Sequence, residues 1–244
     1  MKLFISLLLS VLTLGAAQDV RNSNYLATGE LTHGDDAPPL VANAMDDEFN
    51  QATFNSGLWT WVNQSTASVS VSGKGYLEMT VPGGGTGGFR EIVQNLPSAP
   101  YSFKTKFVCG GVSENFHFCG MVLRESATGK AVAVFLQNSG PTCASFEYSI
   151  TNDTANPATF NVPVSGSGSS NSNCGPFYVQ MARTGTTITI SWSTDPAIDS
   201  MVRTASFTMT TYFTTAPNQI GIFTSGQTAT NTGYGIFYFF RRIS

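Results

Sequence analysis

Apolar and polar residues alternate along most of the chain after residue 44, with the two-residue period of β-strands. In residues 101–109, for example, Phe103, Thr105 and Phe107 share one face. Similar segments predict strands at 67–71, 76–81, 89–95, 145–151, 202–210, 219–225 and 235–243. No segment has the pattern of a long amphipathic helix. About a dozen short strands separated by turns are typical of a sandwich or barrel.

Two hairpins stand out within this pattern. Residues 116–125 and 131–138 flank a turn at 126–130, and residues 177–183 and 186–193 flank a second turn. The first pair is apolar on both faces through its middle. This pattern predicts central strands that are covered on both sides.

Residues 45–64 contain the first two predicted strands and the turn between them. An acidic cluster precedes Phe49, which we expect to lie in the first strand of the sandwich. Asn, Ser and Gly then mark a turn. In the strand that follows, Trp59 and Trp61 share one face, so both should be buried or both exposed.

The chain divides into segments of different character. Residues 1–17 carry Lys2, an apolar run too short to span a bilayer and a small-residue end, which predicts a secretory signal cleaved after Ala17. An uncleaved anchor or a fortuitous apolar start is the alternative. Residues 18–43 lack periodicity and are interpreted as an extended arm, either a spacer or an attachment segment. Residues 44–244 form the predicted sandwich domain.

The low content of charged residues excludes some classes of binding partner. Charged residues make up 11% of the chain and the net charge is −3, whereas charged residues usually make up about 25%. The longest run of Lys or Arg is the pair Arg241–Arg242, so the chain lacks the basic patch that nucleic-acid binding needs. A nucleic-acid partner is therefore not expected. No later stretch is apolar enough for a membrane span. A secreted, extracellular location is expected.

The chain has four cysteines, an even number that favours two disulfides in an exported protein. Three pairings are possible, and the sequence does not choose among them. We favour Cys109–Cys119, which could staple one hairpin, together with Cys143–Cys174, because each pair brackets a loop. Zinc is the alternative, but there is no CxxC motif and the two histidines lie far apart in the sequence.

Four segments carry a resemblance to a known family. They are DDEFN…LWTWVNQ, FREIVQNLPSAPYSF, GMVLRESATGKAVAVF and APNQIGIFTS. The chain resembles the concanavalin A-like lectin/glucanase superfamily, in its divergent laminin-G-like branch. The resemblance implies an all-β fold, a jelly roll in which two antiparallel sheets of six or seven strands form a sandwich. It also implies a concave sheet that often binds saccharide, and pairing of the first and last strands, which puts Phe49 beside residues 237–240.

The catalytic motifs of related enzymes are missing. The glucanase branch carries Glu-x-Asp-x-x-Glu on one strand, and this chain has no Glu-x-Asp. A cross-strand pair such as Glu91 with Glu147 remains open. The Arg-x-Glu strand of alginate-lyase-type jelly rolls is not matched either, because Arg90 and Glu91 are adjacent and point to opposite faces. His117 lies between phenylalanines and is interpreted as a packing residue.

Saccharide binding needs aromatic rings that stack on sugars and planar groups that hydrogen-bond to hydroxyls. The candidates of these two kinds are Trp59, Trp61, Tyr148, Arg90, Arg124 and Gln137. Asp46, Asp47 and Glu48 are candidate calcium ligands, with a charged edge strand as the alternative interpretation. No other cofactor is expected. Asn63 and Asn152 begin glycosylation sequons.

The sequence favours a secreted, non-catalytic, lectin-like domain that binds a glycan or glycosylated surface at a cell surface or matrix. One alternative is a structural or adhesion module of an extracellular fibre or virion. Another is a glycan hydrolase or lyase with non-standard acids.

Overall fold

The computed structural model describes residues 43–244 apart from 72, 74, 83–87, 111–116, 140–141, 153–175, 194–202 and 227–231. For 137–139, 142–152 and 203–204 it describes the backbone alone. The chain separates into two units, Met1–Leu40 and Val41–Ser244, and the described residues belong to the second. The predicted signal segment and residues 18–42 of the predicted arm therefore lie outside them. Among the described residues, no helix is both long and apolar enough to cross a membrane.

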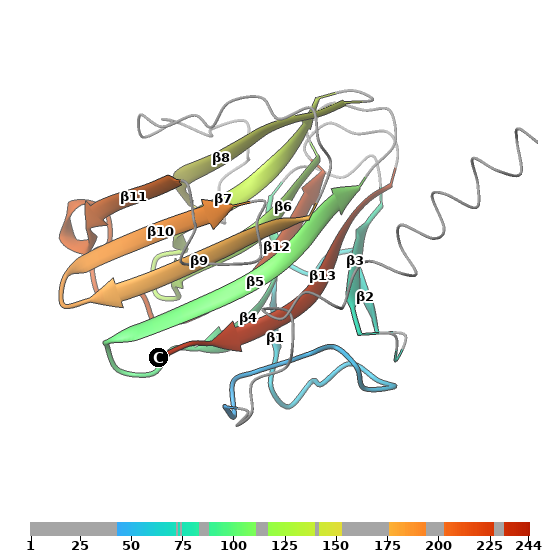
Figure 1. Ribbon diagram of the computed structural model, residues 1–244, viewed down its shortest axis with the longest axis horizontal. Coiled ribbons are helices and arrows are strands. Elements are labelled where there is room, and N and C mark those ends of the chain that lie inside the picture. The colour runs from blue at the N-terminus through green and yellow to red at the C-terminus, as the bar shows by residue number, and fades with distance from the viewer. Residues whose placement is uncertain are drawn as a thin grey trace, which may run out of the picture. The chain divides into compact units, whose positions relative to one another are not determined.

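The described residues form strands in two antiparallel sheets (Figure 1). The six-stranded sheet has the order β1 (Thr60–Val62), β4 (Arg90–Asn95), β12 (Gln219–Gly226), β6 (His117–Glu125), β7 (Lys130–Ser139), β8 (Thr142–Asn152). The seven-stranded sheet has the order β11 (Arg203–Thr208), β10 (Thr187–Ser193), β9 (Phe177–Thr184), β5 (Tyr101–Gly110), β13 (Gly233–Arg242), β3 (Leu77–Val81), β2 (Ser68–Val71). The expected all-β sandwich is confirmed.

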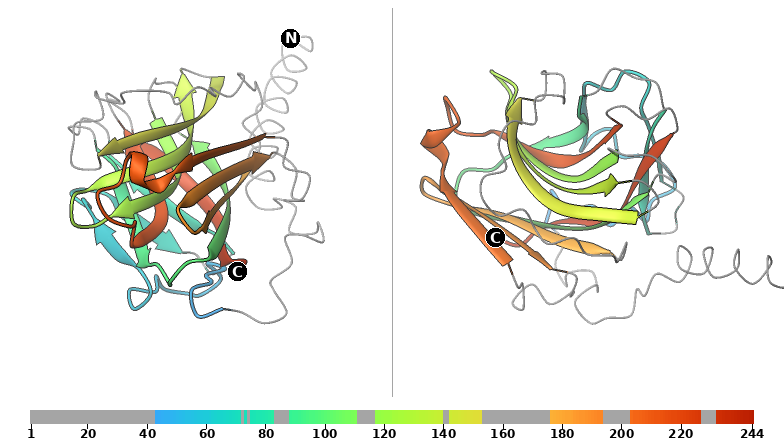
Figure 2. Two further views of the ribbon diagram at one scale, coloured as in Figure 1. Left: turned by 90° about the vertical axis from the view of Figure 1, so that its left-hand side faces the viewer. Right: turned by 90° about the horizontal axis from the view of Figure 1, so that it is seen from above.

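The main core lies between the two sheets (Figure 2). Alternate residues of each strand enter it, such as Phe103 and Phe107 from β5, and Met121 and Leu123 from β6. All four of these side chains are fully buried. The two-residue period that predicted the strands therefore corresponds to a face that packs against the opposite sheet.

The predicted central hairpin is confirmed as β6 and β7. A second apolar cluster covers the outer face of the six-stranded sheet, away from the main core, and includes Val122, Phe135 and Phe223. Gly120 and Gly221 lie on this face, and a Cβ added at either would come within 2.0 Å of a carbonyl oxygen of the neighbouring strand. Neighbouring strands therefore approach these two positions more closely than a side chain permits.

The predicted first strand is reduced to a single bridge. Asp47 pairs with Phe240 of β13, each amide donating to the other residue's carbonyl oxygen at 2.8 Å. Phe49 has a φ of 49°, a conformation that ends an extended run. Phe49 nonetheless reaches the last strand as expected, because its ring lies 6.2 Å from Trp59 and Trp59 lies 5.1 Å from Phe240.

Candidate functional site

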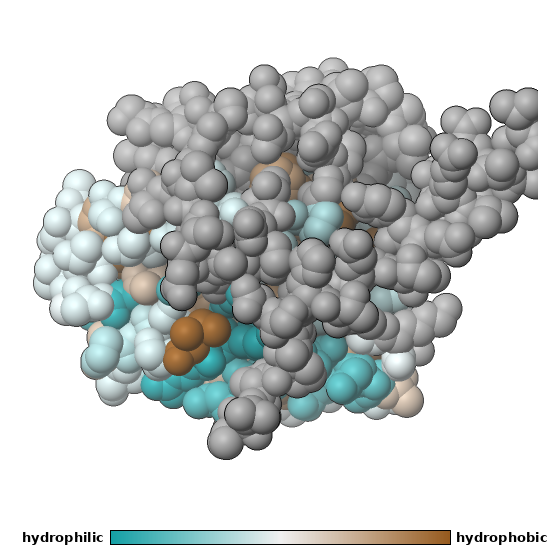
Figure 3. Space-filling model, viewed as in Figure 1, coloured by the Kyte–Doolittle hydropathy of each residue, from teal (hydrophilic) through white to brown (hydrophobic). Residues whose placement is uncertain are grey.

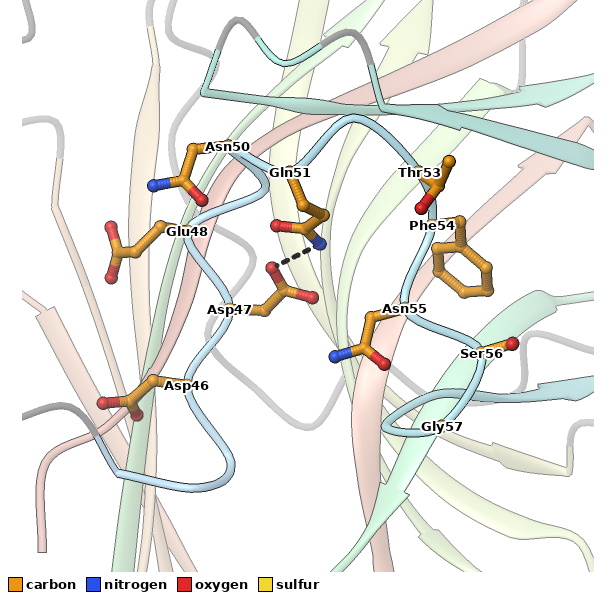
Figure 4. A pocket seen from close by; sticks show the side chains of 10 residues that line it. All are labelled: Asp46, Asp47, Glu48, Asn50, Gln51, Thr53, Phe54, Asn55, Ser56 and Gly57. Atoms are coloured by element: carbon orange, nitrogen blue, oxygen red, sulfur yellow. Dashed lines mark hydrogen bonds between the residues drawn. The ribbon is translucent and has the colours of Figure 1, made fainter.

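The loop that precedes β1 encloses an open hollow of about 490 Å³. Half of its ten lining residues carry amide or hydroxyl side chains, and the others are three acids, one phenylalanine and one glycine. They are Asp46, Asp47, Glu48, Asn50, Gln51, Thr53, Phe54, Asn55, Ser56 and Gly57. Asp47, Gln51 and Asn55 point into the space between the two arms of the loop (Figure 4).

Asp47 holds the loop in shape. One oxygen, Oδ1, accepts hydrogen bonds from the amide of Phe49 at 2.9 Å and from Nε2 of Gln51 at 3.0 Å. The other, Oδ2, accepts from Nε1 of Trp59 at 2.8 Å. The bond to the Phe49 amide supports the unusual backbone of that residue. A buried carboxylate thus ties both arms of the loop to the core.

The other two acids are also committed to protein donors. Asp46 accepts from the amides of Asn43 and Arg242, each at 2.7 Å. Glu48 pairs with Arg241 through two hydrogen bonds, at 2.6 and 2.7 Å. Asp46 and Glu48 point to the opposite side of the loop from Asp47 (Figure 4). The proposed calcium ligands do not converge, and no cluster suited to a metal ion occurs among the described residues.

Most of the remaining lining residues are exposed to solvent. These are Asn50, Thr53, Asn55 and Ser56, whereas Phe54 is half-buried and packs against the main core. Amides and hydroxyls can hydrogen-bond to sugar hydroxyls in both directions, and a phenyl ring offers an apolar face for the C–H side of a pyranose. The hollow can therefore accept a polyhydroxylated, uncharged ligand.

The predicted binding residues do not form one site. Trp59 lies in the core, 3% exposed, where no sugar can stack on it. Trp61 faces the same core and is half-buried. Arg90 begins β4 and has a lowered pKa because burial disfavours its charge. Gln137 lies on β7 and Tyr148 on β8, and for these two residues the structure describes only the backbone.

Arg124 makes polar contacts on both β4 and β12. It lies on the outer face of the six-stranded sheet, where its Nε is 3.8 Å from Oε2 of Glu91 and its Nη1 donates to Oε1 of Gln219 at 2.6 Å. Gly221 lies between the strands that carry the pair and provides no side chain to block their contact. Glu91 is fully buried, so this cluster braces the sheet rather than presenting an open binding surface.

The strand order separates the acids considered for catalysis. Glu91 is on β4 and Glu147 is on β8, with β12, β6 and β7 between them. Four strand spacings amount to roughly 19 Å along a sheet, whereas paired catalytic carboxylates stand about 5–10 Å apart. The strand order gives no support to catalysis by Glu91 and Glu147.

Cys109 and Cys119 do not bracket one hairpin as expected, because they lie on β5 and β6 of different sheets. Their thiols are not bonded to each other in the structure, and their pairing stays a prediction. The side chains of Cys143 and Cys174 lie outside the described residues. Asn63 is exposed at the end of β1, whereas only the backbone is described for Asn152. Both sequons remain predictions.

Sequence reasoning missed the hollow because it treated Asn55, Ser56 and Gly57 as turn residues. Residues 50–57 are longer than a tight turn and combine amides, hydroxyls and a phenylalanine between two anchored ends. That combination of length and composition was the available signal.

Apolar side chains are sparse on the described surface. On the coloured part of Figure 3, brown is confined to small patches. Ile243, 52% exposed, is the one exposed large apolar side chain among the described residues.

Comparisons with known proteins support the fold. No protein-family model and no curated protein match the chain. Among solved structures, it is similar to a mutant of the GH43 protein BlXynB from Bacillus licheniformis, with 14% identity and a TM-score of 0.63 over 85% of this chain and 40% of that one. It is similar to xylan beta-1,4-xylosidase from Bacillus Halodurans, with 12% identity and a TM-score of 0.60 over 84% and 40% of the chains.

A third similar structure is that of an uncharacterized protein from Mycobacterium paratuberculosis. It has 8% identity and a TM-score of 0.51 over 81% of this chain and 98% of that one. The chain spans about 40% of the length of the two Bacillus proteins. At these identities the likeness concerns the fold alone, and it shows that this chain shares its β-sandwich architecture with parts of GH43 proteins.

Proposed function

We propose that this protein is a secreted, non-catalytic, carbohydrate-binding module of the concanavalin A-like type, and that the hollow at residues 46–57 binds the glycan. The observation that carries the proposal is the lining of the hollow. Exposed amides and hydroxyls line it together with the half-buried Phe54, on a loop that Asp47 braces through three hydrogen bonds. A braced loop loses little conformational freedom when a ligand binds.

The charges around the hollow favour a neutral glycan. Asp46, Asp47 and Glu48 line it, and each is already satisfied by protein donors. A polyuronic acid would bring further negative charge to these carboxylates, whereas a neutral chain would not. Xylan fragments are the first candidates, because a protein that shares this fold over 40% of its chain is described as a xylan beta-1,4-xylosidase.

The test is calorimetric or NMR titration of the full secreted chain with neutral xylo-oligosaccharides, with oligogalacturonate as the anionic comparison. Phe54→Ala and Asn55→Ala should each weaken binding about tenfold, since each removes a contact worth about 1–2 kcal/mol. Phe207→Ala, which truncates a half-buried phenylalanine on the edge strand β11, is the matched control and should leave the affinity unchanged.

If Phe54→Ala and Phe207→Ala weaken glycan binding equally, the hollow is not the binding site. The loss of affinity would then come from a different site or from reduced stability of the fold. No binding of any neutral glycan at millimolar concentration would instead favour a structural or adhesion module. Release of shorter sugars during the titration would indicate a hydrolase or lyase.

A further inference from the structure

Two thiols face each other across the core. Cys109 lies on β5 of the seven-stranded sheet and Cys119 on β6 of the six-stranded sheet, and both are buried. Both belong to the main core cluster. Burial raises the pKa of the Cys119 thiol well above its ordinary value, and a hydrogen bond with Cys109 raises it further. The two cysteines are therefore neighbours in the core, and both are shielded from solvent.

Gly235 explains how two residues of opposite sheets come so close. It is the direct cross-strand partner of Cys109 in the pairing of β13 with β5. A Cβ added at Gly235 would lie 2.9 Å from the Cβ of Cys119 and 2.7 Å from Oγ1 of Thr224 on β12. Because Gly235 has no side chain, the six-stranded sheet approaches this position closely. The backbone geometry thus places Cys119 against the strand pair that carries Cys109, independently of the thiol contact.

We propose that Cys109 and Cys119 form a disulfide that crosses the core and joins the two sheets when the chain folds in an oxidising compartment. This bond differs in kind from a hairpin staple, because it constrains the sandwich itself. It rests on the predicted export of the chain, but not on the proposed binding of a glycan.

The oxidation needs a disulfide as electron acceptor, either a small molecule such as oxidised glutathione or a protein disulfide. One cysteine thiolate attacks that disulfide, releases one thiolate and forms a mixed disulfide. The second cysteine then attacks the mixed disulfide and releases a second thiolate. The two protein thiols lose two protons and two electrons, and the acceptor is reduced to two thiols.

The burial of the pair also fixes when the bond can form. Cys109 is 4% exposed and Cys119 is 0% exposed, so an external disulfide cannot reach them in the closed sandwich. Thiol exchange needs a thiolate and access to the acceptor. The bond must therefore form before the sheets close, and once formed it should resist reduction in the native state.

Peptide mapping tests the bond directly. The secreted full chain is denatured with an alkylating reagent and no reductant, and then digested with trypsin. Cleavage after Lys106 and Arg124 gives one peptide, residues 107–124, whose only cysteines are Cys109 and Cys119. We expect this peptide to be unalkylated and lighter by two hydrogen atoms. Cleavage after Glu114 should then leave two fragments that separate only on reduction.

An alkylated 107–124 peptide, or its linkage to a peptide containing Cys143 or Cys174, would overturn the proposal. Gly235→Ala supplies a second test that keeps all cysteines. It should lower the oxidised fraction of the peptide, whereas Gly57→Ala, where an added Cβ meets only Asn55 Oδ1 at 3.4 Å, should not.

Thermal unfolding separates this bond from the other cysteines. Reductant added to the unfolded chain before refolding should lower the Tm of the wild type by about 5–10 °C more than that of the double variant Cys109→Ser, Cys119→Ser. Equal lowering in both would show that the reductant acts on other cysteines, and would contradict a stabilising bond between the sheets.

Discussion

At the scale of single residues, Asp47 has the largest structural role in the loop around the hollow. Its two oxygens serve the Phe49 amide, the Gln51 amide group and the Trp59 indole, so both arms of the loop depend on one buried carboxylate. The sequence showed three adjacent acids and gave no means of ranking them. The ranking comes from alternation at the bridge to β13, which turns Asp47 inward and Asp46 and Glu48 outward.

Asp47→Ala should therefore destabilise the protein by about 2–4 kcal/mol, because it leaves a buried indole N–H and a positive-φ amide without their acceptor. Denaturant unfolding measures the change. Asp46→Ala removes a half-exposed carboxylate and is the matched control, with an expected cost of about 1 kcal/mol. A larger effect for Asp46→Ala would contradict the central position given to Asp47.

The carboxylate of Glu125 makes the free energy of unfolding depend on pH. Burial raises its pKa, but hydrogen bonds from the Thr215 hydroxyl, the Thr214 amide, Thr128 and the Thr215 amide outweigh this effect and lower the pKa from 4.5 to about 2. Because the folded pKa is the lower one, the stabilisation is complete above pH 4.5 and is lost as the pH falls toward 2. Glu125→Gln should therefore be less stable than the wild type at pH 7, and the difference should shrink on acidification. Unfolding curves at several pH values check this, and a constant difference would refute it.

At the scale of elements, the sequence predicted the long strands well because a buried face imposes a two-residue period on them. It could not predict that the segment around Asp47 pairs at only one position, since that depends on a side-chain hydrogen bond and on the backbone of Phe49. The hollow was missed for the same reason. A loop shaped by contacts distant in sequence leaves no periodic signal.

Gly120 and Gly221 test the close strand approach in the six-stranded sheet. Gly120→Ala and Gly221→Ala would bring a methyl group within 2.0 Å of backbone carbonyl oxygens that cannot move without breaking the sheet. Each substitution should cost at least about 3 kcal/mol or prevent folding. Gly57→Ala adds the same group where there is room and should be nearly neutral by thermal unfolding. Near-neutral Gly120→Ala would show that the strands can separate without penalty.

At the scale of the whole molecule, the described core is complete within Val41–Ser244, and the strands of both sheets come from this unit. A chain beginning at Val41 should therefore fold alone, with a Tm within about 3 °C of the full chain, because it keeps the described core and both sheets. Circular dichroism and calorimetry check this. A truncated chain that fails to fold would assign a structural role to the segment before Val41.

The carboxylate of Asp46 accepts a hydrogen bond from the amide of Asn43 and another from the amide of Arg242. The first and last described segments of the sandwich therefore meet at a single side chain. A unit built in this way can be inserted into a surface loop of a host protein without stretching either connection. It also suits circular permutation, with a short linker across this junction and new ends opened in the exposed turn 126–128 between β6 and β7.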